Sequence, residues 1–376
     1  MNRPGQCTLS PKNDYVDIDN YLLSKMARRI LLVQGDSAER LEIGKYFLSI
    51  PFRLGIKVYP FTKFHPNPSY DSVVDGVKEF HAQCCDMIVA LGGGSAIDVA
   101  KCIKLYENLD PSQNYLCQEI LPNRVPFLAI PTTAGTGSET TRYAVIYFEG
   151  EKQSITHESC IPEAICLDPS TLKTLPTYHR ASSMLDAFCH ALEAWWSVNS
   201  TEESRRFSKG AIKLILEYRH DYMNGNQNVA EYMMQAAHLA GKAINITQTT
   251  AGHAMCYKLT SLYGLAHGHA AALCDAVLWP YMATHLDDCC DARGRGWLEG
   301  IFQEISEAMG SVPLQEAMEI LPCWLGEMGM EFHGGNAGDI AKLASAVNLV
   351  RLRNNPVRMD IKIFGELYGK ILSIGM

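Results

Sequence analysis

The chain has 376 residues, of which 47% are hydrophobic, 20% charged and 9% aromatic, and its formal net charge at pH 7 is −8. This composition excludes a disordered, collagenous or coiled-coil chain, and the length favours two domains of ordinary size. The acidic balance argues against nucleic acid as a partner, because proteins that neutralise phosphates usually carry clustered basic residues.

The first half of the chain alternates short apolar runs with segments long enough for helices. The apolar runs are 30–33, 56–59, 87–91, 125–130, 144–148 and 164–167. Runs of this length, mostly rich in Val, Ile and Leu, suit strands that are buried on both faces of a parallel sheet. Residues 70–83 and 96–106 lie between them and are long enough for crossover helices. The pattern predicts an open α/β sheet.

One predicted strand runs directly into three glycines, in the segment Leu-Gly-Gly-Gly-Ser-Ala-Ile-Asp-Val-Ala-Lys at 91–101. Glycine suits backbone that must lie close to a ligand, and the helix that follows offers unpaired N–H groups and the positive end of its dipole. We therefore expect a phosphate at Gly92, Gly93, Gly94 and Ser95. The segment is neither a G-x-G-x-x-G fingerprint nor a P-loop, and the alternative is a tight turn with Ser95 as helix cap.

A second predicted strand ends in the polar loop Pro-Thr-Thr-Ala-Gly-Thr-Gly-Ser-Glu at 131–139. Ligands of open α/β sheets bind outside the carboxyl ends of the strands, where two such loops would converge. Either loop alone could be an ordinary turn, but together they indicate a dinucleotide, with Thr132 and Thr133 as further contacts to its pyrophosphate.

After Pro176 the strand-like runs disappear and helical periodicity takes over. The expected helices are 181–197, 202–222, 229–246, 269–283, 297–309, 314–328 and 337–347. Breakers such as Asn224-Gly225-Asn226 and Gly334-Gly335-Asn336 lie between them. Residues 177–376 are therefore predicted to form an all-helical second domain.

Two residues of the first of these helices have metal-ligand chemistry. Asp186 and His190 are four residues apart, so they share one helix face among apolar neighbours. A buried Asp and His need a partner, which is either each other or a cation.

Two further histidines, His253 and His267, are 14 residues apart. On one unbroken helix they would be separated by about 21 Å, but Gly264 and Gly268 supply breaks that could fold the second imidazole back beside the first. Taken singly, each histidine could be a satisfied core residue. The Asp–His pair and these two histidines together fit a divalent metal with N and O ligands and room for a substrate oxygen.

Four ordered motifs resemble the signatures of the iron-dependent (group III) alcohol dehydrogenases, and the resemblance covers nearly the whole chain. They are the two glycine-containing segments at 91–101 and 131–139, Asp-x3-His-Ala-x-Glu at 186–193 and His-x13-His-Gly at 253–268. The resemblance implies a Rossmann-like nucleotide domain (residues 1–176) and a helical metal and substrate domain (177–376), the architecture of dehydroquinate synthase. It also implies NAD(H) or NADP(H) as cofactor and Fe²⁺, or Zn²⁺, as metal.

The resemblance also assigns individual residues by motif position. The implied metal ligands are Asp186, His190, His253 and His267. Further implied cofactor contacts are Asp98, Thr136, Thr141 and Lys152.

The sequence departs from the family pattern at two positions. Many members carry a second His four residues after the first ligand of the H-x13-H pair, where this chain has Tyr257. Some NAD-selective members end the first strand with Asp, where we align Gly35, with Asp36 one residue later. The choice between NAD and NADP therefore stays open.

Local sequence around the last motif, with Thr141-Arg-Tyr143 and Arg353-Asn-Asn-Pro356, is similar to the branch of phosphonoacetaldehyde reductases. Arg142 follows the second loop and Lys258 lies five residues after His253, so both are candidates to hold a phosphonate or sulfonate. The alternative is that both are surface charges with partly buried stems.

The reaction implied by the resemblance is reversible hydride transfer between a nicotinamide and a small aldehyde or alcohol, with phosphonoacetaldehyde and 2-hydroxyethylphosphonate as the expected pair. The ribose hydroxyl, Tyr257 and His269 are unranked candidates for the proton relay. The alternatives are a dehydrogenase of a neutral alcohol or diol, and a dehydroquinate-synthase-like lyase, whose Glu-His-His ligand set fits less well. A non-catalytic protein would need all four ligand positions to be packing coincidences.

The remaining features concern location and partners. The N-terminus lacks the apolar segment of a secretory signal, and no run reaches about 18 apolar residues. The 13 cysteines are an odd number, and many lie in apolar segments, which favours reduced thiols. We expect a cytoplasmic enzyme with a small-molecule partner and no membrane or nucleic-acid partner, and we leave a homodimer open.

Overall fold

The computed structural model describes residues 5–310, 312–347 and 351–373. The chain divides into two compact units, of which the first contains the residues up to Thr133 and Gly137–Leu175. The second contains Ala134–Thr136 and the residues from Pro176 onward. The division at 175/176 adjoins the boundary expected after residue 176, while residues 134–136, expected in the first domain, group with the second unit.

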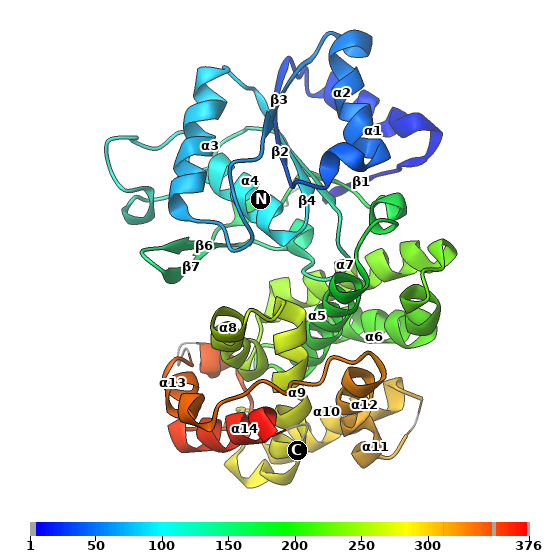
Figure 1. The fold of residues 1–376 in the computed structure, drawn as a ribbon, viewed down its shortest axis with the longest axis vertical. Helices are drawn as coiled ribbons and strands as arrows, with labels where there is room; N and C mark the ends of the chain where they lie inside the picture. Colours follow the sequence, from blue (N-terminus) through cyan, green and yellow to red (C-terminus); the bar gives the residue numbers. More distant parts are fainter. Residues whose placement is uncertain (1–4, 311, 348–350, 374–376) are drawn as a thin grey trace. The chain divides into compact units, whose positions relative to one another are not determined.

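The first unit is built on a six-stranded sheet in which every neighbouring pair of strands is parallel (Figure 1). The strands in spatial order are β1 (Cys7–Leu9), β8 (Ala164–Cys166), β5 (Phe127–Pro131), β4 (Met87–Gly92), β2 (Arg29–Gln34) and β3 (Lys57–Phe61). Five of these strands coincide with predicted apolar runs, which confirms the parallel sheet. The short edge strand β1 was not predicted.

Helices cover both faces of this sheet, and alternate residues of each strand point to opposite faces. Leu31 and Val33 belong to the core that includes α3 (Tyr70–Ala82) and α4 (Gly94–Tyr106). Ile30 and Leu32 belong to the core that includes α1 (Lys12–Ser24) and α2 (Glu42–Leu54). Figure 1 shows these two helix pairs on either side of the strands. Because both faces are buried, the strands read as almost continuous apolar runs.

One predicted strand of the parallel sheet lies elsewhere. Residues 144–148 fall in β6 (Tyr143–Phe148), which pairs antiparallel with β7 (Glu151–Thr156) as a separate two-stranded sheet. Glu149 and Gly150 both have positive φ, as a type I′ hairpin turn requires. Placing 144–148 in the parallel sheet was therefore wrong, since the apolar run belongs to a hairpin that packs Ala144 and Ile146 into the α3–α4 core.

The second unit is helical. Its helices are α5 (Thr177–Trp196), α6 (Glu202–Met223), α7 (Ala230–Thr247), α8 (Ala251–Tyr263), α9 (His267–Thr284), α10 (Arg295–Ala308), α11 (Leu314–Met318), α12 (Ile320–Glu327), α13 (Ile340–Ser345) and α14 (Ile361–Ser373). The all-helical prediction is confirmed, although α8 and α14 were not predicted. The single helix expected over 314–328 is divided into α11 and α12, because Pro322 has no N–H to bond the carbonyl of Met318.

Two findings bear on the surroundings of the protein. Within the described ranges, none of the helices combines the length and apolarity needed to cross a membrane. All 13 cysteines are free thiols.

A buried lysine ties α4 to the segment that follows the second loop. Lys101 is fully buried, and its Nζ donates to Ser138 Oγ at 2.9 Å, Thr141 Oγ1 at 3.1 Å and the Tyr143 carbonyl at 2.6 Å. Ser138 Oγ in turn donates to Asp98 Oδ1 at 2.7 Å. An ammonium can be removed from water here because each of its three protons has an acceptor.

We predict that Lys101→Met, which keeps most of the side-chain volume, lowers the free energy of unfolding by about 3–5 kcal/mol, because it leaves buried acceptors and Asp98 without their cation. Calorimetry and urea denaturation measure the loss. Lys78→Met on the exposed surface of α3 is the matched control and should change stability little. Equal, small effects of the two substitutions would contradict the proposed importance of the buried ammonium.

Candidate functional site

The two loops expected to bind a dinucleotide lie at the place where the chain changes direction across the sheet. From β2 the chain passes to β3 on one side and then to β4 on the other. Ligands of open α/β sheets bind at such a point, beyond the carboxyl ends of the strands. Gly35, directly after β2, donates its N–H to the Leu91 carbonyl at 3.1 Å. The end of the first long strand and the glycine loop are therefore adjacent.

The glycine loop leads straight into α4. Gly93 precedes the helix, and no side chain in the described part of the chain caps its N-terminus. Ser95 lies inside the first turn, so the alternative with Ser95 as helix cap was wrong. Gly93 has φ −73°, so glycine is not required here by a left-handed backbone. A Cβ at Gly92 would lie 2.6 Å from Ala96 Cβ, which shows that close packing requires this glycine.

The second loop lies beside the first. The Thr132 N–H donates to the Gly92 carbonyl at 3.0 Å, and a Cβ at Gly93 would be 3.4 Å from Thr133 Cγ2. Thr136 belongs to the three residues that group with the second unit. The structure thus brings Thr132 and Thr133 to the glycine loop.

Three other expected cofactor contacts lie beside this region and have structural partners. Asp98 accepts from Ser138 Oγ and, at 3.0 Å, from the Val145 N–H. Thr141 is buried and accepts from Lys101, while Lys152 is half-buried in β7. Direct nucleotide contact stays a prediction for Asp98, Thr141 and Lys152.

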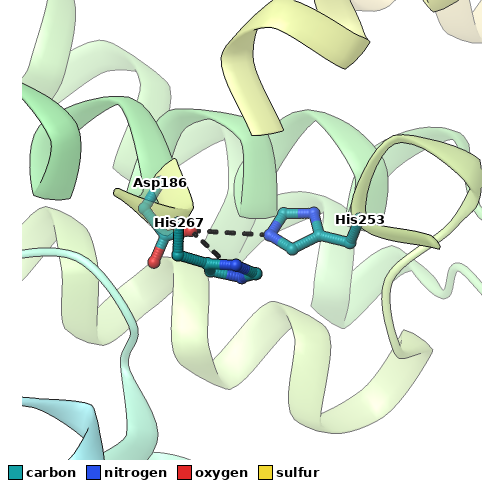
Figure 2. A group of neighbouring side chains, drawn as sticks. All are labelled: Asp186, His253 and His267. Atoms are coloured by element: carbon teal, nitrogen blue, oxygen red, sulfur yellow. Dashed lines mark ion pairs between the residues drawn. The ribbon is translucent and has the colours of Figure 1, made fainter. Parts of the chain in front are cut away.

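Three of the four predicted metal ligands converge in the second unit (Figure 2). Asp186 Oδ1 of α5 lies 3.5 Å from His253 Nε2 of α8 and 3.9 Å from His267 Nε2 of α9. One ligand atom from each residue lies within 4.8 Å of the others. Asp186 and His253 are buried and His267 is half-buried.

The fourth predicted ligand, His190, is adjacent but stands outside this group of three. Its Nδ1 lies 3.9 Å from Asp186 Oδ2, as the four-residue spacing on α5 predicts. Its ring stacks on that of His253, with centroids 4.4 Å apart and an interplanar angle of 15°.

Glycines allow the three helices to meet. Gly264 has φ +69° and ends α8, so that α9 starts at His267 with its ring centroid 5.3 Å from that of His253. Gly268 does not interrupt a helix, contrary to the prediction. It lies within α9, where α9 and α5 approach each other closely. A Cβ there would lie 2.0 Å from the Ser182 carbonyl oxygen of α5.

The electrostatics of the cluster suit a divalent cation. Asp186 Oδ1, His190 Nδ1 and His253 Nε2 are buried and, among the described residues, make no hydrogen bond of good geometry. Burial would raise the pKa of Asp186, but the neighbouring histidines outweigh it and hold that pKa well below its usual range. Burial lowers the pKa of His190 to about 4, against the opposing effect of Asp186, so its imidazole is neutral. The ionised carboxylate of Asp186 and the neutral imidazole of His190 are donors of the kind that such a metal requires.

Glu193, the last residue of the 186–193 motif but not a predicted site residue, orients His253. Its Oε1 contacts His253 Nδ1 and accepts from the His253 N–H at 3.0 Å, while Oε2 accepts from the N–H and, at 2.8 Å, the hydroxyl of Thr250. Burial lowers the pKa of His253, but Glu193 and Asp186 outweigh it and raise that pKa to about 10. Since a carboxylate only accepts, Nδ1–H points to Glu193 and Nε2 to Asp186. A second acidic residue among the apolar residues that follow His190 was the signal available in the sequence.

The two side chains expected in proton transfer have different surroundings. Tyr257 stacks on the ring of His267, with centroids 5.5 Å apart and an interplanar angle of 14°. His269 is buried, with Nδ1 3.1 Å from the Tyr178 hydroxyl and Nε2 2.5 Å from the Met330 carbonyl oxygen. Both ring nitrogens of His269 are therefore engaged outside the metal cluster.

The two candidate anion-binding cations also differ. Arg142, in the first unit, pairs with Glu158 at 3.0 Å and lies over the ring of Tyr143. Lys258, in the second unit, is half-buried on α8, and no carboxylate of the described residues forms an ion pair with it. The charge of Arg142 is thus partly compensated by a carboxylate.

Comparison with known proteins gives matches along most of the chain. A family model described as iron-containing alcohol dehydrogenase matches residues 13–169, and one described as Fe-containing alcohol dehydrogenase family, C-terminal, matches residues 180–331. A phosphonoacetaldehyde reductase of Streptomyces viridochromogenes is 32% identical over 327 residues, which are 83% of this chain and 82% of that protein. Alcohol dehydrogenase 4 of Saccharomyces cerevisiae is 31% identical over 290 residues, 73% of each chain.

Solved structures show the same fold. A sulfoacetaldehyde reductase from Bifidobacterium kashiwanohense, in complex with NAD⁺, matches with a TM-score of 0.87 and 23% identity, covering 99% of this chain and 98% of its own. A 1,3-propanediol oxidoreductase matches with a TM-score of 0.86 and 25% identity, covering 97% of each chain.

The contacts of Glu193 generate a prediction for its replacement. Glu193→Gln keeps the shape but places an amide –NH₂ where a carboxylate oxygen accepts, so His253 loses its fixed orientation. We expect the affinity for a divalent metal to fall about 10- to 100-fold, measured by competition with a chromophoric chelator. Glu299→Gln, at an exposed position of α10, is the charge-matched control and should leave the affinity unchanged. Unchanged affinity in Glu193→Gln would remove Glu193 from the metal site.

Proposed function

The chain belongs to the iron-containing alcohol dehydrogenase family and is an oxidoreductase acting on CH–OH groups, and from this premise we propose that it reduces a small anionic aldehyde. Phosphonoacetaldehyde, reduced to 2-hydroxyethylphosphonate, is the proposed substrate, because the relative with 32% identity bears that name. The observation that supports a metal-dependent reaction is the convergence of Asp186, His253 and His267, in which Asp186 Oδ1 and His253 Nε2 are buried without a hydrogen bond among the described residues.

We propose Asp186, His190, His253 and His267 as the ligands of one divalent ion, Fe²⁺ by family and Zn²⁺ as the alternative. His190 is included because its buried Nδ1 faces Asp186 and makes no hydrogen bond with the described residues. When bound, such an ion supplies a Lewis acid that polarises a carbonyl oxygen. Glu193 keeps the Nδ1 proton of His253 on the side away from Asp186, so that Nε2 is directed toward the ligand group.

The nucleotide is proposed to be NAD(H), as in the structural relative that holds NAD⁺, with NADP(H) as the alternative. The uncapped N-terminus of α4 suits its pyrophosphate, because the helix dipole and free N–H groups favour an anion there. Gly92, Gly93, Thr132 and Thr133 line this place, since they are mutually adjacent. Asp36 is exposed directly after Gly35 and is the proposed partner of the ribose.

The chain's own polar side chains are proposed to supply substrate binding and the proton. Lys258 is the better candidate for the phosphonate, since Arg142 already pairs with Glu158. Tyr257 is the better candidate for the proton relay, since both ring nitrogens of His269 are engaged elsewhere.

The metal proposal predicts the behaviour of a ligand variant. His267→Ala should lose bound metal and activity together, because one of the converging donors is removed. Elemental analysis after anaerobic loading with Fe²⁺ gives metal content, and near-unchanged circular dichroism is expected because the substitution is confined to the start of α9. Full metal occupancy in the double variant His253→Ala/His267→Ala would refute the site.

The substrate proposal predicts a selective effect of the cation on α8. Lys258→Ala should reduce kcat/KM for phosphonoacetaldehyde at least about tenfold, because a desolvated charge-assisted pair contributes about 1.5–3 kcal/mol. The kcat/KM for propanal should change little. Arg142→Ala is the matched comparison, and we expect it to reduce kcat/KM for phosphonoacetaldehyde less than Lys258→Ala does.

Initial rates of NADH and NADPH oxidation with the two aldehydes provide the measurement. Equal losses on both aldehydes in Lys258→Ala would assign this residue to the scaffold, and a wild-type preference for propanal would favour the neutral-alcohol alternative. A lyase would regenerate its nucleotide at each turnover, so stoichiometric NAD(P)H oxidation excludes that alternative.

A further inference from the structure

The turn between α7 and α8 contains a strained residue. Gln248 has φ +61° and ψ 176°, a region of backbone conformation that is almost confined to glycine. It lies five residues before His253, the proposed ligand near the start of α8. A non-glycine residue keeps such a conformation only where its surroundings hold it.

The amide of Asn354 holds this turn. Its Nδ2 donates to Gln248 Oε1 at 2.9 Å and to the Thr249 carbonyl at 3.2 Å. Within the turn, the Gln248 N–H donates to the Ile244 carbonyl at 2.8 Å, and Thr247 Oγ1 donates to the Gln248 carbonyl at 2.8 Å. The strained turn therefore has hydrogen bonds on both sides of Gln248. Asn354 supplies bonds from a distant part of the chain to Gln248 and Thr249, beside those that Ser197 Oγ and Asn199 Nδ2 donate to the Thr247 carbonyl, each at 3.3 Å.

The same asparagine is anchored to the segment that directly follows α5. Its Oδ1 accepts from Asn199 Nδ2 at 2.8 Å, and its carbonyl accepts from the Val198 N–H at 3.0 Å. Asn354 is only 8% exposed, so these bonds are shielded from water. The residue connects the helix that carries Asp186 to the turn that begins the helix of His253.

We infer that Asn354 is a positioning residue for the metal ligands, and that it acts by holding the strained turn at Gln248. Thr250, two residues after Gln248, donates through its N–H and hydroxyl to Glu193, which also contacts His253. Relaxation of Gln248 toward an ordinary conformation would displace Thr250 and the start of α8. This inference rests on the proposed metal centre and gives a role to Asn354 of the Arg353-Asn-Asn-Pro356 segment.

The test compares three substitutions in the full-length protein by their affinity for Co²⁺. Co²⁺ held by N and O ligands is distinguished by its visible absorption from Co²⁺ held by thiolates, which matters in a chain with 13 free cysteines. Asn354→Ala should raise the dissociation constant about tenfold, as is typical of residues that support metal ligands. Asn354→Asp, which changes the shape less, should have an effect in the same direction and serves if the alanine variant is unstable.

Rescue separates positioning from general stability. In Asn354→Ala/Gln248→Gly the turn can keep its conformation without strain, so the dissociation constant should return to within about threefold of the wild-type value. Asn355→Ala is the matched control: Asn355 is also buried, but among the described residues its side-chain amide donates only to the nearby Val357 carbonyl, at 2.7 Å. It should lower the melting temperature without changing the Co²⁺ affinity.

Each result bears on one claim. Unchanged affinity in both Asn354 variants, or a loss that Gln248→Gly does not recover, would overturn the inference while leaving the metal centre intact. Failure of the wild-type protein to bind Co²⁺ through N and O ligands would instead overturn the proposed metal centre itself.

Discussion

The arrangement of the second unit depends on the burial of one carboxylate, Asp186. Asp186 is only 2% exposed. Burying a carboxylate costs free energy unless cationic groups or hydrogen-bond donors surround it. Asp186 meets this requirement through His253, whose pKa is raised to about 10, and through His267, which come from two other helices, while the neutral His190 lies beside it on its own helix. The relative positions of α5, α8 and α9 near this point therefore follow from the need to compensate a single negative charge.

Close backbone contact makes this compensation geometrically possible. A Cβ at Gly268 would lie 2.6 Å from Asp186 Cβ, and one at Gly252 would lie 1.9 Å from Asp275 Oδ1. Burial and the neighbouring Glu193 raise the pKa of Asp275 well above its usual range, so Asp275 is the protonated member of this carboxyl pair. Glu193 then carries the charge and faces His253. Gly268 thus leaves room for Asp186, and Gly252 leaves room for Asp275 and for Glu193, the carboxylate that orients His253.

Local features of the sequence were sufficient for much of this organisation. The strands of the parallel sheet could be predicted because burial on both faces leaves a continuous apolar run, and Asp186 and His190 because their spacing equals one helical turn. The hairpin of β6 was misplaced because a short apolar run does not show which partner strand it has. Glu193 was overlooked as an orienting residue because its partners, Thr250 and His253, lie 57 and 60 residues away.

The two units support their candidate sites in the same physical way. Lys101 in the first unit and Asn354 in the second are buried polar residues whose donors are all used, and their partners come from separate segments of the chain. A buried residue of this kind stabilises one arrangement of the surrounding chain. Any other arrangement would leave one of its hydrogen-bond donors unsatisfied away from water. Apolar packing alone tolerates small shifts of a loop or helix end, whereas metal ligands and phosphate-binding backbone do not. Buried polar contacts at the turn before α8 and at the segment after the second loop therefore provide the precision that apolar cores cannot.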